Sequence, residues 1–240
     1  MQFRLECHEV LESTSSLVKQ RAEAGEAEGL AIQALRQSAG RGRQGRGWDS
    51  PAGNLYISVL LRPAVPLRDA PQWSFVAAVA LAETLNGLLP EASKLSLKWP
   101  NDLLLQGAKA AGILVETGIA PSHALDWICI GIGVNIRSKP NLPDRPTACL
   151  AEYSAAPPAP EALAQSLLVS LAYWHGVRLQ QGFAPIREAW LRHAPAMGAP
   201  ISLKRDGALL EGAFAGLSPE GGLLLAKGRE VQLILAGEII

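Results

Sequence analysis

The sequence predicts an α+β fold, in which helices pack on a mixed β-sheet and a small antiparallel β-barrel follows at the C-terminus. Short apolar runs separated by turn residues recur through the first part of the chain and indicate neighbouring strands of one sheet. Stretches of helical composition interrupt these runs. Beyond Pro195 the apolar runs become short and evenly spaced, which is typical of a small barrel. We therefore expect one domain at residues 1–194 and a second at residues 195–240.

The first elements alternate between helix and strand. Ser13 and Thr14 can cap a helix that continues over residues 17–24. Residues 30–36, LAIQALR, predict a strand, and residues 54–61, NLYISVLL, predict a second strand rich in β-favouring side chains. Glycine and arginine dominate the segment between these strands, so we expect a loop there.

The middle of the chain predicts a buried helix and then a group of strands. Residues 71–89 open with proline and carry apolar side chains at helical spacing. The expected strands that follow are 95–99, 103–105, 111–117 and 127–136. Two further helices are expected at 161–180 and 183–193. In the last segment, turn signals such as Asp206-Gly207 separate the apolar runs and predict the antiparallel barrel.

Composition excludes several classes of function. Because 22 basic and 22 acidic side chains cancel, no global field attracts nucleic acid or an anionic membrane. The three cysteines and four histidines have neither a disulfide framework nor metal-ligand spacing, so we expect reduced thiols and no zinc site. The charged N-terminus and the lack of a long apolar run predict a cytoplasmic protein without a membrane segment. Any electrostatic function must therefore be local.

The string GRGRQG at residues 40–45 satisfies the G-x-G-x-x-G dinucleotide-binding pattern. That pattern requires a helix immediately after it, but two glycines and a proline follow within eight residues, so the match is accidental. Instead, Arg36, Arg41, Arg43 and Arg46 place four positive charges within eleven residues that contain no acid. A glycine-rich loop whose guanidinium groups bind an anion is the functional interpretation. A solvated surface loop is the alternative.

A second polar cluster lies in the segment KWPNDLLLQGAKAAGILVET, residues 98–117. Trp99-Pro100-Asn101-Asp102 has the composition of a tight turn, so its polar groups would emerge beside a hairpin. Lys109 precedes a nearly continuous apolar strand, and a lysine shielded by such neighbours attracts a phosphate more strongly than one in water. An ordinary hairpin with an exposed lysine is the alternative.

The motifs GRGRQGRGW, KWPND, KAAGILVET and GIGVNI, in this order and spacing, resemble those of biotin protein ligases without an N-terminal DNA-binding domain. The similarity is specific from about Glu9 to Ile136. It implies a class II synthetase-like catalytic domain at 1–194 and an SH3-like barrel at 195–240. It also implies an enzyme that uses ATP and Mg²⁺ to convert biotin to biotinyl-5′-AMP and then biotinylates a carrier lysine. A lipoate-type acyl ligase and a non-catalytic biotin-binding module are the alternatives.

The resemblance also implies a partner. That partner is a biotin carboxyl carrier protein, belonging to acetyl-CoA carboxylase or a related biotin carboxylase. Only eight residues precede Glu9, so no DNA-binding domain fits and we expect no DNA or membrane partner. A homodimer is one assembly that the resemblance allows.

Site residues follow from the same motifs, position by position. The expected catalytic residues are Lys109, Arg41 and Arg43. The residues expected to bind biotin or its adenylate are Ser13, Thr14, Ser15, Gln37, Gly40, Arg41, Gly42, Arg43, Arg46, Trp48, Asn101, Lys109, Gly112, Leu114, Gly133 and Asn135. Asp102 is expected to hold or orient the magnesium ion. Ser15 stands where the family usually has asparagine, and a hydroxyl cannot replace both amide groups in one geometry.

Overall fold

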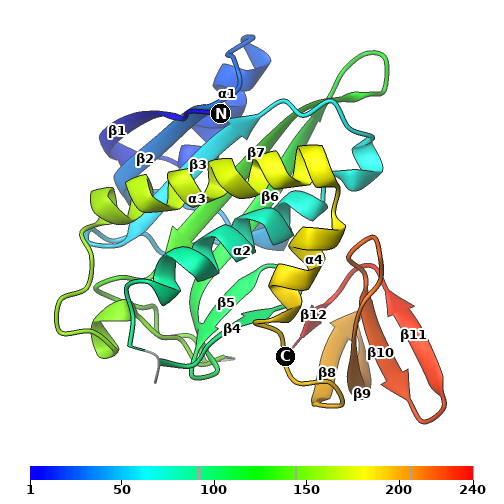
Figure 1. Cartoon of the computed structure of the whole chain (residues 1–240). Coiled ribbons are helices and arrows are strands. Elements are labelled where there is room, and N and C mark those ends of the chain that lie inside the picture. Colours follow the sequence, from blue (N-terminus) through cyan, green and yellow to red (C-terminus); the bar gives the residue numbers. More distant parts are fainter. Residues whose placement is uncertain (91–92, 144, 206, 240) are drawn as a thin grey trace.

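Two sheets organise the chain in the computed structural model (Figure 1), which describes residues 1–90, 93–143, 145–205 and 207–239. The larger sheet has the strand order β1-β2-β3-β7-β6-β5-β4. Its strands are β1 (Arg4–Leu11), β2 (Leu30–Gln37), β3 (Leu55–Leu61), β4 (Leu95–Lys98), β5 (Asp102–Leu105), β6 (Ala108–Ile119) and β7 (Leu125–Val134). β1 and β2 are parallel and the other pairs antiparallel, so the mixed sheet and the α+β class are confirmed.

Helices cover the two faces of this sheet unequally. The helices are α1 (Thr14–Glu23), α2 (Gln72–Asn86), α3 (Pro160–Gln181) and α4 (Ala184–Leu191). α2 and α3 lie across one face, as Figure 1 shows, and form the main core with alternate β3 side chains such as Ile57 and Val59. α1 packs on the opposite face, where Val18 meets Leu60 and Trp127 in a smaller core.

The same alternation leaves small side chains on the α1 side of the sheet. In β6 and β7 the apolar side chains of Ile113, Ile130 and Ile132 join the main core. Gly112 and Gly133 are paired opposite each other on these strands, and they point to the other face. On the face of the sheet that α1 covers, these glycines therefore leave space for a cavity.

The C-terminal segment forms a second, antiparallel sheet. Its strands are β8 (Pro200–Arg205), β9 (Ala208–Leu217), β10 (Leu223–Lys227), β11 (Glu230–Ile234) and β12 (Glu238–Ile239), in the order β11-β10-β9-β8-β12. This sheet contacts the end of β4, because Trp99 Nε1 donates to the Gly221 carbonyl (3.1 Å) and Lys98 Nζ donates to the Ile239 carbonyl (2.9 Å). Closure into an SH3-like barrel and a boundary between residues 194 and 195 stay predictions.

Several details differ from the sequence-based expectation. Strand β1 was not predicted, because its charged side chains lie on an exposed edge strand and give no apolar signal. Ser13 occupies the N-cap position of α1, but its side chain makes no capping hydrogen bond. The three cysteines do not differ from the expectation and are free thiols.

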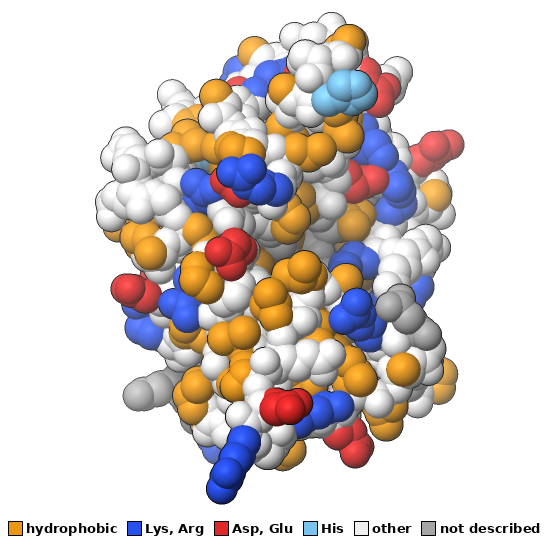
Figure 2. Space-filling view, turned by 90° about the vertical axis from the view of Figure 1, so that its right-hand side faces the viewer, with side chains coloured by type: hydrophobic (Ala, Val, Ile, Leu, Met, Phe, Trp, Pro, Cys, Tyr) orange, Lys and Arg blue, Asp and Glu red, His pale blue; other side chains and the backbone are white. Residues whose placement is uncertain are grey.

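Charge and hydropathy at the surface agree with the composition. Basic and acidic side chains intermingle with hydrophobic ones over the face shown in Figure 2, in keeping with the zero net charge. No helix within the described ranges is long and apolar enough to cross a membrane.

Candidate active site

A cavity of about 410 Å³ opens on the α1 side of the larger sheet. Of the predicted site residues it is lined by Ser13, Thr14, Ser15, Gln37, Arg41, Gly42, Arg43, Arg46, Trp48, Asn101, Asp102, Lys109, Gly112, Leu114, Gly133 and Asn135. Gly40 does not line it. A Cβ on Gly40 would lie 2.3 Å from the Trp48 carbonyl oxygen, so glycine at this position permits the close approach of two backbone segments.

Neutral hydrogen-bonding groups form one end of the cavity. Ser58 Oγ lies 2.8 Å from Thr14 Oγ1 and 3.1 Å from Ser15 Oγ. Gln37 Oε1 accepts from the main-chain N–H of Thr14 (2.8 Å). Gln37 Nε2 donates to Ser50 Oγ (2.9 Å), whose hydroxyl donates to a main-chain carbonyl of the glycine-arginine loop (2.8 Å). These contacts fix the hydroxyls at the start of α1 and the amide at the end of β2 in one network.

Sequence reasoning missed Ser58 and Ser50, which complete that network. Ser58 is fully buried. The signal was present, because Ser58 is a small hydroxyl residue within the otherwise apolar or aromatic strand LYISVLL. A buried hydroxyl needs a partner, so its position in that strand predicts a polar group on the facing element.

A tryptophan lies on the glycine floor in the middle of the cavity. A Cβ added to Gly112 would lie 2.9 Å from the Trp48 ring, and one added to Gly133 would lie 2.6 Å from it. Glycine at both positions therefore lets the indole rest on the strands. Trp48 Nε1 is buried and has no hydrogen-bond partner within the described part of the chain, so this donor is available to a ligand.

The glycine-arginine loop folds back on itself between β2 and β3. Arg41 and Gly47 form an antiparallel bridge at its neck, and Gly42 N donates to the Arg46 carbonyl (2.7 Å). At its tip, Gln44 and Gly45 adopt left-handed backbone conformations with φ of 57° and 73°. The loop is thus a compact turn rather than an extended linker.

Each of the three loop arginines has a partner from a distant segment. Arg41 Nη2 lies 2.9 Å from Glu116 Oε1, and Arg43 Nη1 donates to the Asn101 side-chain carbonyl (3.1 Å). Arg46 makes two contacts with the Glu238 carboxylate (3.0 and 2.8 Å). The local sequence contains no acid, but the fold supplies two. Arg41 and Arg46 are therefore paired with acids that lie outside the loop sequence.

Lys109 and Asp102 form an ion pair beside the tryptophan. Lys109 Nζ lies 2.6 Å from Asp102 Oδ1 and 5.5 Å from the centroid of the Trp48 ring. Both side chains are largely buried. Asp102 lies on β5 and Lys109 on β6, and these two strands are neighbours in the sheet. The pair places an ammonium group at the cavity wall with its orientation fixed by the carboxylate.

The two predicted asparagines hold main chain near that pair. Asn101 Nδ2 donates to the Ile113 carbonyl (2.5 Å). Asn135 Nδ2 donates to the Ala148 carbonyl (3.0 Å), and its main-chain N–H bonds to the Ala110 carbonyl (2.8 Å). Their side-chain N–H groups therefore brace the walls of the cavity.

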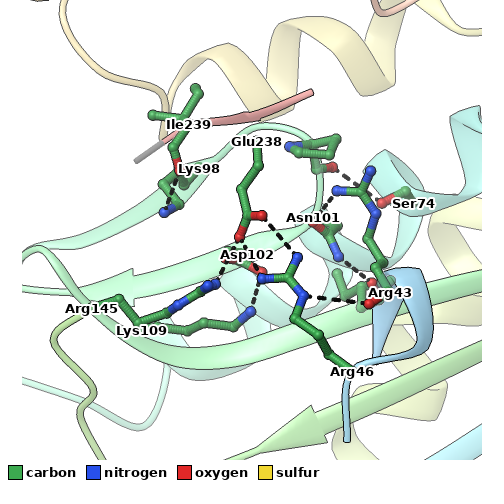
Figure 3. Close-up of polar contacts among 12 residues, drawn as sticks. Arg43, Arg46, Ser74, Lys98, Asn101, Asp102, Lys109, Arg145, Glu238 and Ile239 are labelled. Atoms are coloured by element: carbon green, nitrogen blue, oxygen red, sulfur yellow. Dashed lines mark hydrogen bonds and ion pairs between the residues drawn. The ribbon is translucent and has the colours of Figure 1, made fainter. Parts of the chain in front are cut away.

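A further charged group from the C-terminal sheet closes this end. Figure 3 shows Arg46 and Arg145 converging on Glu238, and Arg145 Nη1 lies 2.7 Å from Glu238 Oε1. Burial raises the pKa of the Glu238 carboxyl, but hydrogen bonds from Arg46 and Arg145 outweigh burial and bring the pKa to about 2. Burial lowers the pKa of nearby Lys98, and the negative charge of Asp102 partly offsets this decrease. Arg145 and Glu238 carry no sequence signal, since neither belongs to a recognised motif.

The residues present do not form a resident metal site. Within the described residues, no group of three or more His, Cys, Asp or Glu side chains could hold a metal ion. The two acids near Lys109, Asp102 and Glu238, are each bound to basic side chains. A divalent cation would therefore have to bring most of its ligands with it, as a nucleotide does.

Comparison with known proteins identifies relatives over most of the chain. Residues 7–135 match the biotin/lipoate A/B protein ligase family. The biotin--[acetyl-CoA-carboxylase] ligase of Paracoccus denitrificans is 39% identical over 87% of this chain and 88% of that protein. The bifunctional ligase/repressor BirA of Bacillus subtilis is 32% identical over 97% and 72%. The structure of the Aquifex aeolicus biotin protein ligase in complex with biotin and ATP superposes with a TM-score of 0.82, at 27% identity over 99% and 97% of the chains.

Proposed function

The chain belongs to the biotin/lipoate A/B protein ligase family, and we propose that it is an ATP-dependent biotin protein ligase. The observation that carries this function is a single cavity with a neutral hydrogen-bonding end and a cationic end. Two anionic reactants, a carboxylate and a triphosphate, can meet only where positive charge offsets their repulsion. The cavity supplies that charge beside a site for a neutral polar ring.

The neutral end suits the ureido ring of biotin. That ring presents one carbonyl acceptor and two N–H donors, which match the hydroxyls of Thr14 and Ser15 and the amide of Gln37. The valeryl chain of biotin is apolar, and Trp48 and Leu114 offer apolar walls between the two ends. The carboxylate of biotin would then point toward the cationic end.

The cationic end suits activation by ATP. A carboxylate oxygen of biotin attacks the α-phosphorus, the bond to the β-phosphate bridging oxygen breaks, and pyrophosphate leaves with the electron pair. Lys109, Arg43 and Arg46 offset the negative charge that gathers around this phosphorus. Asp102 keeps the Lys109 amine directed into the cavity by their 2.6 Å contact. The product is the mixed anhydride biotinyl-5′-AMP.

The transfer step needs an amine from another protein. The amine of an acceptor lysine attacks the anhydride carbonyl, an amide bond forms, and AMP leaves while the amine loses a proton. The Paracoccus relative is named for acetyl-CoA carboxylase, so we infer that the acceptor is a lysine of a biotin carboxyl carrier protein. Homodimerisation and a cytoplasmic location stay predictions.

Magnesium enters this proposal as the counter-ion of ATP. Mg²⁺ commonly binds through substrate phosphates and one or two carboxylates. Because Asp102 is already paired with Lys109, its use as a magnesium contact stays a prediction.

The function is tested by following the activated acid. The protein is incubated with MgATP and either biotin or lipoate, and the ligand retained by the protein is identified by mass. We expect biotinyl-5′-AMP, together with pyrophosphate release that requires biotin. Preferential formation of the lipoyl adenylate would instead support a lipoate-type ligase, and retention of unmodified biotin alone would support a binding module.

A further inference from the structure

We propose that Glu116 and Lys19 are positioning residues that hold the neck of the glycine-arginine loop against the sheet through Arg41. The expected effect on retention of biotinyl-5′-AMP rests on the proposed function, whereas the Glu116 contact with Arg41 and Lys19 does not. Arg41 was expected to be a catalytic residue. Its guanidinium contacts Glu116, whereas Arg43 and Arg46 contact Asn101 and Glu238 near Lys109 (Figure 3).

One carboxylate oxygen joins three segments that are far apart in the sequence. Glu116 lies on β6, and its Oε1 atom is 2.9 Å from Arg41 Nη2 and 2.7 Å from Lys19 Nζ. The Glu116 side chain is only 18% exposed. Its other oxygen, Oε2, is buried without a hydrogen-bond partner among the residues described. The two cations offset the cost of burying this carboxylate.

Arg41 is the residue through which this contact can control the loop. It pairs with Gly47 across the neck, and Trp48 N donates to the Gly40 carbonyl (2.9 Å) directly behind that pair. The tip that carries Arg43 and Arg46 projects beyond the neck. Fixing Arg41 on β6 therefore limits the positions that the whole tip can reach, without any contact between Glu116 and the tip.

Lys19 connects the same carboxylate to the neutral end of the cavity. It lies four residues after Ser15 on α1, so both side chains project from one side of the helix. Glu116 thus binds the helix that presents Thr14 and Ser15 and also the loop that lines the cavity. This junction holds the two parts at a fixed separation.

Limited trypsin digestion tests the contact directly, because trypsin cleaves after the loop arginines. The full chain is digested without ligand, and cleavage after Arg41, Arg43 and Arg46 is mapped by mass. We expect Glu116→Gln to raise the rate of loop cleavage by about three- to five-fold, since cleavage follows the open population and the lost ion pair involves a partly exposed Arg41 guanidinium. Lys19→Met should raise it less, because Arg41 keeps its partner.

Two further variants show whether the effect comes from the Glu116 contact itself, from the loss of its charge or from a general loosening of the fold. Glu116→Asp keeps the charge but withdraws the carboxylate by one methylene, so we expect it to behave like Glu116→Gln. Glu6→Gln is the matched control, because Glu6 pairs with Arg21 of α1 (3.2 Å) on the exposed surface and does not contact the loop. Wild-type cleavage rates in both Glu116 variants would overturn the proposal, as would an equal increase in Glu6→Gln.

The functional arm measures the dissociation of biotinyl-5′-AMP from each protein. In the Glu116 variants it should be faster by a factor similar to that seen in digestion. Unchanged dissociation from variants with a loosened loop would overturn the positioning role. If wild-type protein forms no adenylate, the proposed function fails, and the digestion still decides whether Glu116 holds the neck.

Discussion

At the end of the cavity next to α1 the polar groups are neutral, whereas at the end next to β12 they are charged. The neutral end comes from α1, β2 and β3, which pack directly on one another. The charged end gathers Arg46, Lys109, Arg145 and Glu238 from four separate segments. The neutral end is held by hydrogen bonds between packed elements, and the charged end is held by ion pairs.

This difference suggests a division of work between recognition and activation. A neutral network at the start of a packed helix keeps its geometry whether or not a ligand is bound, which suits selection of one vitamin ring. The charged end depends on the loop and on the last strand, so it can rearrange when triphosphate enters and pyrophosphate leaves. Variants at the two ends should therefore affect different substrates.

The largest effect is expected at the cationic end, from Lys109→Ala. Removing the amine takes one preorganised positive group from the site of charge development, which costs on the order of 10² to 10³ in rate. Biotin-dependent exchange of pyrophosphate into ATP should fall by that factor. Lys227→Ala, at an exposed position at the end of β10, is the control and should exchange normally. Retained exchange in Lys109→Ala would remove Lys109 from the mechanism.

A smaller and more selective effect is expected at the neutral end, from Ser58→Ala. Loss of this buried hydroxyl leaves Ser15 without the contact it has now and weakens the support of Thr14. A loss of about 1.4 kcal/mol, within the range for buried hydrogen bonds, corresponds to a rise of about ten-fold in KM for biotin. KM for ATP should not change. An equal rise in both constants would show that the two ends do not act separately.

The sequence was sufficient where a feature is local. The apolar runs predicted β2, β3 and the strands β4 to β7, because burial of a strand is visible in its own residues. The motifs likewise placed Thr14, Gln37, Lys109 and Trp48 around one cavity. Thr14, Gln37 and Lys109 lie at or next to the ends of predicted elements, and Trp48 lies in the loop between two predicted strands.

The sequence was insufficient where function depends on pairs of distant residues. Arg41 and Glu116 are 75 positions apart, and Arg46 and Glu238 are 192 apart. No spacing rule connects such residues, so the loop sequence alone does not reveal the acids that pair with Arg41 and Arg46. The exposed edge strand β1 was missed for a different reason, since it buries too little apolar surface to show a pattern.

The smallest effect on KM is expected from Glu238→Gln. The pH dependence of this effect shows whether the Glu238 carboxylate keeps its charge over the pH range of the assay. The folded pKa of about 2 lies below the ordinary value of 4.5, so the contribution of the carboxylate is complete above pH 4.5 and is lost only as the pH falls through about 2. Between about pH 6 and about pH 9 Glu238 stays ionised. The ratio of variant to wild-type KM for ATP should therefore be constant over this range.

That ratio itself should be modest, at about three- to five-fold, because the ion pairs of Glu238 with Arg46 and Arg145 are partly exposed to solvent. KM for biotin should not change, since Glu238 lies at the opposite end from Thr14 and Ser15. Initial rates at varied ATP and at varied biotin measure both constants. A ratio that changes across neutral pH would contradict the depressed pKa. A change in KM for biotin alone would contradict the assignment of this end to ATP. Glu238 orients two guanidinium groups, and it can affect the binding of the ureido ring only through the loop that carries Arg46.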